Sequence, residues 1–133
     1  MIPFSFTLEP GKPITDQVVY AVERAVVSGE LQPGDPFPSL RVLAKELRIN
    51  PNTSQKIVAR LKQDGLLVIE PGKGTFINPN YHPPLGADRA LLEQEVEPLV
   101  VRARKLGVSL DDLTTAIENR WEALSNHYKN ETK

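Results

Sequence analysis

The stretch Asn50-Pro51-Asn52-Thr53-Ser54-Gln55-Lys56 decides the fold, because it has the pattern of a helix start followed by exposed polar side chains. Asn50 is a residue type that caps free helical amides, and proline suits the first helical position, where its missing N–H is not needed. Four side chains project from the leading turns: Asn52, Thr53, Gln55 and Lys56. Three apolar residues can contribute to the packed side: Ile57, Ala59 and Leu61. This arrangement is typical of a helix that reads nucleic acid.

A second helix is predicted directly before this one. Ser39 is placed to cap it, and its expected span is residues 40–47. Its apolar stripe has helical spacing: Leu40, Leu43, Ala44 and Leu47. The following helix should run from Asn50 to about Asp64 and stop at Gly65, with Ile57, Val58 and Leu61 inward. Only about three or four residues connect the two helices, which is the length of a helix-turn-helix joint.

The remaining N-terminal residues complete a winged helix-turn-helix of about 80 residues. Residues 14–28 have apolar side chains at helical spacing and end in Ser28-Gly29, where glycine supplies a left-handed stop. The proline-rich stretch 31–38 is predicted to be an ordered connector, with Leu31 and Phe37 anchored in the core. Two apolar and β-branched runs, residues 66–70 and 75–78, flank Pro71-Gly72-Lys73-Gly74 and predict a β-hairpin.

The C-terminal part is predicted to be two helices. Residues 79–86 are dense in proline and form a linker between a winged domain, residues 1–78, and a tail, residues 87–133. The first tail helix, about 87–106, contains Pro98, which should kink or divide it. The second is capped by Ser109 and runs to about Lys129. The fold class is therefore mostly α with a small β-hairpin.

These two helices cannot enclose a useful core, yet they carry long apolar stripes. The first stripe is Leu91, Leu92, Val96, Leu99, Val100 and Ala103, and the second is Leu110, Leu113, Ile117, Trp121, Leu124 and Tyr128. A second copy of the chain is the economical way to bury them, because two-fold assemblies are the commonest solution for a self-complementary patch. The alternative is a monomer in which the helices pack back on the winged domain.

Positive charge is concentrated on the predicted helix-turn-helix. The whole chain has a net charge of −1, but residues 39–63 hold six bases against one acid, a local net charge of +5. The bases are Arg41, Lys45, Arg48, Lys56, Arg60 and Lys62. Residues 81–133 hold seven bases against nine acids. An anionic partner is therefore expected at the basic block, although a charge run can also be only a solvated face.

Composition and motifs argue against several other classes. No window approaches the roughly 20 apolar residues of a membrane span, and we expect a cytoplasmic protein. There are no cysteines and only two distant histidines, His82 and His127, so no metal site or cofactor is expected. No nucleophile–base pair or phosphate loop is present, and Gly72-Lys73-Gly74 is too short a glycine signal to indicate nucleotide binding. The sequence does not predict an enzyme.

The chain resembles the GntR family of bacterial transcription regulators, and within it the short YtrA-type subfamily. The resemblance rests on Pro13-Ile14 with Gln17, Ser28-Gly29-Glu30-Leu31, Pro33-Gly34-Asp35, Phe37-Pro38-Ser39-Leu40-Arg41 and Ile49-Asn50-Pro51-Asn52-Thr53. It continues through the wing at Gly72-Lys73-Gly74-Thr75-Phe76-Ile77 and into the two-helix tail. Two positions depart from the pattern. Leu40 stands where many relatives have an acid, and Ser54 stands where a small apolar or aromatic residue is common.

The resemblance implies a homodimeric regulator, acting as a repressor, that binds a palindromic operator in double-stranded DNA. The residues and the resemblance together predict DNA contacts by Ser39, Arg41, Asn50, Asn52, Thr53, Gln55, Lys56, Gly72, Lys73 and Gly74. The predicted dimer interface comprises Leu92, Val96, Leu99, Val100, Leu113, Ile117, Trp121 and Leu124. A small-molecule effector, if one exists, would bind between the tail helices or at the dimer interface.

Each assignment has a plainer alternative. Asn52 and Thr53 can serve local capping alone, and Lys73 can be an ordinary turn lysine. Arg60 and Lys62 are expected to be solvated or to make nonspecific backbone contacts. The whole winged domain can also be a protein-interaction module that docks an acidic partner through residues 39–63.

Overall fold

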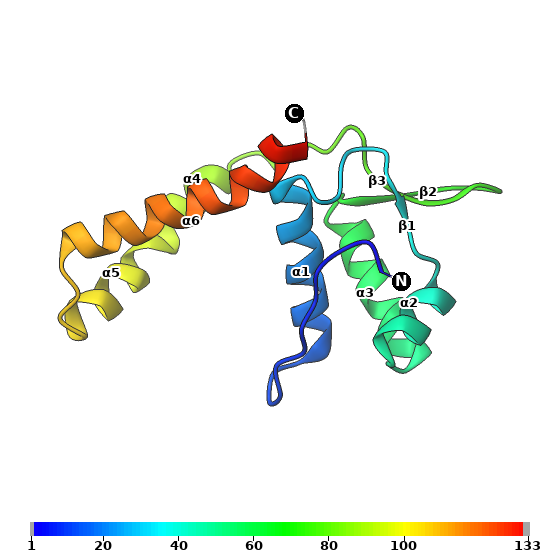
Figure 1. Cartoon of the computed structure of the whole chain (residues 1–133), viewed down its shortest axis with the longest axis horizontal. Coiled ribbons are helices and arrows are strands. Elements are labelled where there is room, and N and C mark those ends of the chain that lie inside the picture. Colours follow the sequence, from blue (N-terminus) through cyan, green and yellow to red (C-terminus); the bar gives the residue numbers. More distant parts are fainter. Residues whose placement is uncertain (1, 132–133) are drawn as a thin grey trace. The chain divides into compact units, whose positions relative to one another are not determined.

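The computed structural model describes residues 2–131, with side chains as far as Ser125 (Figure 1). The predicted tail residues His127 and Tyr128 therefore lie outside the described side chains, as do residues 132–133. The chain divides into two compact units, of which one is residues 82–123 and the other is the remainder of the described chain. Among the described residues, no helix is long and apolar enough to cross a membrane.

Three helices of the first unit occupy the predicted positions. They are α1 (Ile14–Ser28), α2 (Leu40–Leu47) and α3 (Pro51–Gln63). At the end of α1, Gly29 adopts a left-handed φ of 83° and its N–H bonds to the Val26 carbonyl, as expected of a glycine stop. Figure 1 shows α1 and α3 running side by side, and the two helices are in contact.

The sheet has one strand more than the predicted hairpin. β2 (Leu67–Glu70) and β3 (Gly74–Ile77) form that hairpin, and β1 (Pro36–Phe37) adds to β3, giving the antiparallel order β1-β3-β2. The prediction of an ordered connector at residues 31–38 did not include this short strand. β1 depends on pairing with the distant residues Thr75 and Phe76, and Pro36 is tolerated because the strand lies at a sheet edge.

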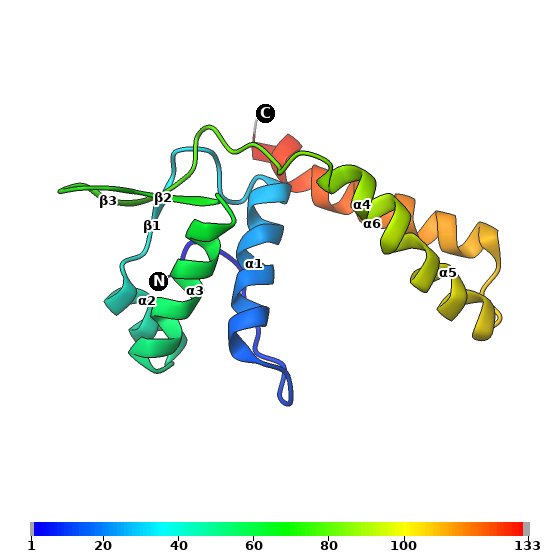
Figure 2. The same cartoon turned by 180° about the vertical axis from the view of Figure 1, so that it is seen from behind.

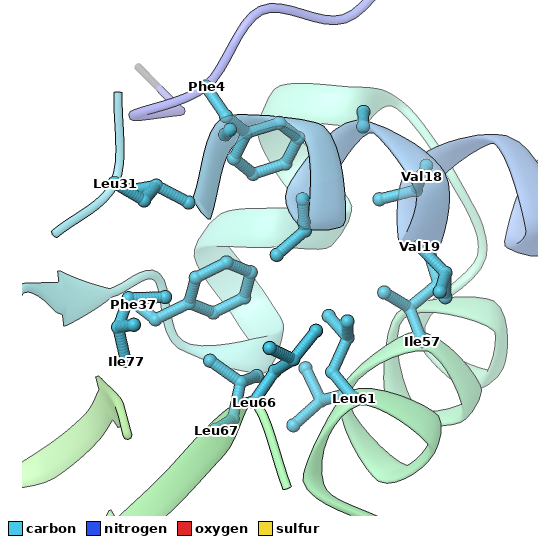
Figure 3. Close-up of a cluster of buried hydrophobic side chains, with 14 of the residues drawn as sticks. Phe4, Val18, Val19, Leu31, Phe37, Ile57, Leu61, Leu66, Leu67 and Ile77 are labelled. Carbon is cyan, nitrogen blue, oxygen red and sulfur yellow. The ribbon is translucent and has the colours of Figure 1, made fainter. Parts of the chain in front are cut away.

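The core of the first unit lies between the three helices and the sheet (Figure 3). Its buried side chains are Phe4, Val18, Val19, Ala21, Val22, Ala25, Leu31, Phe37, Leu43, Ile57, Val58, Leu61, Leu66, Leu67 and Ile77. Leu31 and Phe37 anchor the connector, as predicted. Phe4 was not predicted to be part of the core, yet it is 4% exposed and its ring stacks on Phe37 with centroids 6.0 Å apart.

The segment before α1 is held along that helix by Gln17. The Gln17 side-chain carbonyl accepts from the Glu9 N–H at 2.7 Å, and its amide donates to the Glu9 and Lys12 carbonyls, both at 2.9 Å. One side chain thus satisfies three backbone groups, which is how an irregular segment without a strand partner meets its hydrogen-bonding requirement. Nearer the N-terminus, the Ser5 N–H donates to Glu30 Oε1 at 2.6 Å, next to the core residue Phe4.

The second unit contains α4 (Ala87–Gln94), α5 (Val96–Lys105) and the start of α6 (Leu110–Glu131) (Figure 2). The predicted first tail helix is divided, as Pro98 indicated. The break is at Glu95, and α4 ends at Gln94, the residue whose carbonyl the Pro98 ring would meet in a continuous helix. α6 begins with the predicted cap, because the Asp112 N–H donates to Ser109 Oγ at 3.1 Å.

Most apolar side chains of the second unit are exposed. Ala103 is buried, while Leu92 is 67%, Ile117 48% and Trp121 73% exposed. So many exposed large apolar side chains within one small unit are typical of a surface that meets a partner.

Replacing Phe4 by alanine should lower the free energy of unfolding by about 3 kcal/mol, because it removes an aromatic ring from a packed core. Urea unfolding followed by circular dichroism measures the change. Phe6→Ala is the matched control, since Phe6 is only half-buried, and should cost clearly less. Equal losses from the two substitutions would show that Phe4 is not a core residue.

Candidate nucleic-acid interface

α3 begins as the sequence predicts. The Asn52 N–H donates to Asn50 Oδ1 at 2.7 Å, and Pro51 occupies the first helical position. The cap uses only the carbonyl oxygen of the Asn50 side chain, so its NH2 group keeps two donors. The first turn of α3 therefore has an ordered backbone and presents polar side chains in a fixed direction.

One side of α3 is buried and the opposite side is exposed. The buried side consists of Ser54, Ile57, Val58 and Leu61. Among the predicted contact residues, Asn52, Gln55 and Lys56 are exposed and Thr53 is half-buried. Ala59 was predicted to help with packing, but it is exposed, because it lies three residues after Lys56 on the polar side of the helix.

Ser54 connects α3 to the start of α2. Its side chain is fully buried, and its hydroxyl donates to the Leu40 carbonyl at 2.8 Å. Sequence reasoning missed this contact and treated Ser54 only as a departure from a family pattern. The available signal was its spacing, because Ser54 precedes Ile57 and Val58 by three and four positions on the buried stripe. The bond fixes the beginning of α2 against the first turn of α3.

α2 presents its first turn to solvent. The Val42 N–H donates to Ser39 Oγ at 3.2 Å, which confirms the predicted cap. Arg41 is exposed, as a phosphate contact would require. Leu40 was predicted to belong to the inward stripe, but its side chain is 42% exposed. The prediction was wrong because Leu40 is the first residue of α2 and lies at the edge of the core, whereas Leu43 and Ala44, one turn later, are buried.

The turn between the two helices depends on Arg48. This residue has a φ of 55°, in the left-handed region that residues other than glycine rarely adopt. Its N–H donates to the Lys45 carbonyl at 3.3 Å, and the next N–H, that of Ile49, donates to the Ala44 carbonyl at 3.0 Å. The left-handed residue closes α2 and lets the chain turn into the Asn50 cap.

The wing ends in a tight turn that carries Lys73. The Lys73 N–H donates to the Glu70 carbonyl at 2.9 Å, and Gly72 has a φ of 78°, so Pro71 and Gly72 occupy the central positions of a type II turn. Gly74 follows with a φ of 125°. A Cβ at either glycine would meet open space, so both are needed for their backbone conformation. Figure 1 shows the hairpin extending away from the three helices, which leaves Lys73 at its exposed outer end.

The basic side chains of residues 39–63 are not all equally available to contact an anionic partner. The Arg60 guanidinium pairs with Asp16 of α1, a contact that was not included in the expectation of a solvated side chain or a nonspecific backbone contact. Glu23 of α1 lies close to Arg60 and Asp64. Partial burial raises the pKa of the Glu23 carboxyl, and repulsion from Asp64 raises it further, while Arg60 opposes both effects. Arg60 therefore belongs to the contact between α1 and α3.

The structure brings the helix residues of the predicted site together. Ser39, Arg41, Asn50, Asn52, Thr53, Gln55 and Lys56 all lie in or next to the first turns of α2 and α3, which pack on each other. Gly72, Lys73 and Gly74 form a separate element at the end of the wing. Within the part of the chain that the structure describes, no group of three or more His, Cys, Asp or Glu side chains could hold a metal ion.

The family described as "Bacterial regulatory proteins, gntR family" matches residues 14–77, from α1 to the end of the wing. The HTH-type transcriptional repressor YtrA of Bacillus subtilis (strain 168) is 30% identical over 102 residues, covering 76% of this chain and 78% of that protein. The chain belongs to the GntR family. It is thus a transcription regulator with a DNA-binding winged helix-turn-helix.

Solved structures are similar to this GntR-family chain beyond the wing as well. A Listeria monocytogenes EGD-e protein described as a transcriptional antiterminator has a TM-score of 0.78 and 27% identity, covering 90% of this chain and 92% of that one. YtrA from Sulfolobus acidocaldarius, a GntR-family transcription factor, has a TM-score of 0.51 and 26% identity, covering 90% and 97%. The relatives are similar to this chain in its tail as well as in its winged part.

Ser54→Ala should lower the free energy of unfolding by about 1 kcal/mol, because it removes a buried hydrogen bond between α2 and α3. Chemical denaturation measures the difference. Gln55→Ala changes the adjacent exposed residue and should stay within about 0.5 kcal/mol of the wild type. If Ser54→Ala were as stable as Gln55→Ala, the bond to Leu40 would not stabilise the fold.

Proposed function

We propose that this GntR-family regulator is a repressor that binds a two-fold symmetric operator as a homodimer. The observation that supports the proposal most is the division of α3 into a buried side and a polar side, with the first turn of α2 exposed beside it. Helices of this kind enter the major groove, and two of them related by a dimer axis bind half-sites about 34–36 Å apart or a multiple of that distance.

The exposed side of α3 suits base recognition. Asn52 and Gln55 carry amides that pair with the two major-groove groups of adenine, and Lys56 carries an ammonium that reaches the acceptors of guanine. Only the main-chain N–H of Asn52 takes part in the cap, so its side-chain amide is not used there. The alternative in which Asn52 serves only as part of the cap thus leaves that amide without a role.

The first turn of α2 and the wing suit backbone contacts. Ser39 Oγ accepts from the Val42 N–H, which leaves the hydroxyl hydrogen for a phosphate oxygen. Arg41 adds a charge at the start of a helix, where free amides and the helix dipole already favour anions. Asn50 contributes its NH2 group. Lys73, at the end of the narrow hairpin, is placed to enter the minor groove, with Gly72 and Gly74 letting the turn approach closely.

Residues 92–124 of the helices α4, α5 and α6 provide the proposed dimer contact. The interface residues are Leu92, Val96, Leu99, Val100, Leu113, Ile117, Trp121 and Leu124, of which Leu99, Leu113 and Leu124 are half-buried and the others exposed. An open groove between α5 and α6 is lined by Val100, Ala103, Arg104, Val108, Ser109, Leu110 and Leu113. Because its lining is mostly apolar, this groove fits side chains of a partner helix better than a polar effector.

Repression is the mode of action that the relatives favour. The Bacillus subtilis relative is named a repressor, and a dimer that covers an operator blocks transcription by occupying the DNA. If purified protein did not distinguish its own promoter from random DNA in a gel shift, a protein-interaction module would become the better explanation.

Lys56→Ala and Arg41→Ala should each weaken DNA binding, and each should reduce the slope of log K against log salt by about one unit, because each removes a positive charge from the DNA-facing surface. Fluorescence anisotropy over a range of salt concentrations measures the slope. Arg60→Ala is the matched control, since Arg60 pairs with Asp16 on α1 and should leave the slope unchanged. Identical slopes for all three variants would contradict the proposed DNA-facing surface.

Ile117→Glu should convert the proposed dimer into monomers, because it places a charge in an apolar interface. Sedimentation velocity at micromolar concentration measures the change, and operator affinity should fall with it. Glu118→Ala, at the next exposed position, should leave the dimer intact. A wild-type chain that sediments as a monomer would contradict the dimer directly.

A further inference from the structure

The apolar stripe of α2 continues past the edge of the core. Leu43 and Ala44 are buried and Leu47 is half-buried, whereas Leu40, one turn earlier on the same side of the helix, is 42% exposed. Leu40 thus places an exposed apolar side chain directly between Ser39 and Arg41, and Val42, two residues further on, is exposed as well. Neither the stability of the core nor a phosphate contact explains it.

Leu40 lies beside the first turn of α3. Its carbonyl accepts the Ser54 hydroxyl at 2.8 Å, and Ser54 directly follows Asn52 and Thr53 in that turn. Because Ser54 is fully buried, this bond holds the Leu40 backbone in a fixed position. Leu40 therefore lies next to the turn of α3 that carries Asn52 and Thr53, two of the residues proposed to contact DNA.

We propose that Leu40 recognises the 5-methyl group of a thymine in each operator half-site. This inference rests on the proposed DNA-binding function and adds a specific base contact to it. Leucine offers no hydrogen bond, so it cannot distinguish bases by donors and acceptors. Among the four standard bases, only thymine presents a methyl group in the major groove, and apolar side chains recognise it by contact.

Burial of one methyl group contributes enough free energy to be measured. Removing a methylene-sized group from an apolar contact lowers the binding affinity by about fourfold. Deoxyuridine differs from thymidine only by lacking this methyl group, and it pairs with adenine in the same way. Replacing thymine by deoxyuridine at the contacted position in both half-sites should therefore lower the affinity of the wild type by about tenfold or somewhat more.

The experiment begins with selection of bound duplexes from a random DNA library by the full chain. The enriched duplex is then synthesised with deoxyuridine at each thymine position in turn, placed symmetrically in both half-sites. Anisotropy titrations compare the wild type, Leu40→Ala and Val42→Ala. Val42 is the matched control, because it is also 42% exposed on α2 but lies two residues further round the helix.

At one thymine position, the wild type and Val42→Ala should lose affinity on deoxyuridine substitution, whereas Leu40→Ala should bind both duplexes equally. Leu40→Ala keeps the carbonyl that Ser54 binds, and Leu40→Gln serves as a second variant if the first is unstable. The proposed methyl contact is contradicted if the wild type binds the thymine and deoxyuridine duplexes equally at every position, or if both Leu40 variants still prefer thymine. Sequence-specific binding is not affected by either result. If selection enriches no sequence, the proposed function fails as well.

Discussion

The burial of one side of α3 is the constraint on which the rest of the winged unit depends. Ile57 and Leu61 are fully buried against α1, α2 and the sheet, so the helix cannot rotate without exposing them. Its polar residues are consequently fixed on the outside. The Ser54 hydroxyl extends this constraint to α2, because it bonds to the Leu40 carbonyl. The first turns of α2 and α3 are thus held in a fixed orientation relative to each other by the same core.

Local chemistry made much of this arrangement predictable. The caps of Ser39 and Asn50 and the stop at Gly29 depend on residues within a few positions, so their patterns are readable in the sequence and were confirmed. The contacts that were missed join distant residues. Phe4 stacks on Phe37, which lies 33 residues later in the chain, and β1 forms only where β3 is present. No periodicity within either segment indicates such a partner.

Two predictions of burial also failed. Leu40 continues the apolar spacing of α2 but is exposed at the start of that helix, whereas Ala59 is apolar but lies on the polar side of α3. The roles of the surface residues in DNA binding and of the second unit in dimerisation remain proposals, since they require partners outside the chain. The exposed Trp121 and Ile117 fit such a partner.

The turn at Arg48 has a consequence for how the protein can change. A left-handed conformation costs a residue with a side chain about 1 kcal/mol relative to glycine. Glycine at this position would make the joint less strained, but it would also remove a positive charge from the segment between the two helices. Replacing Arg48 by glycine would therefore raise thermal stability and weaken electrostatic attraction to DNA, so this single position affects the two properties in opposite directions.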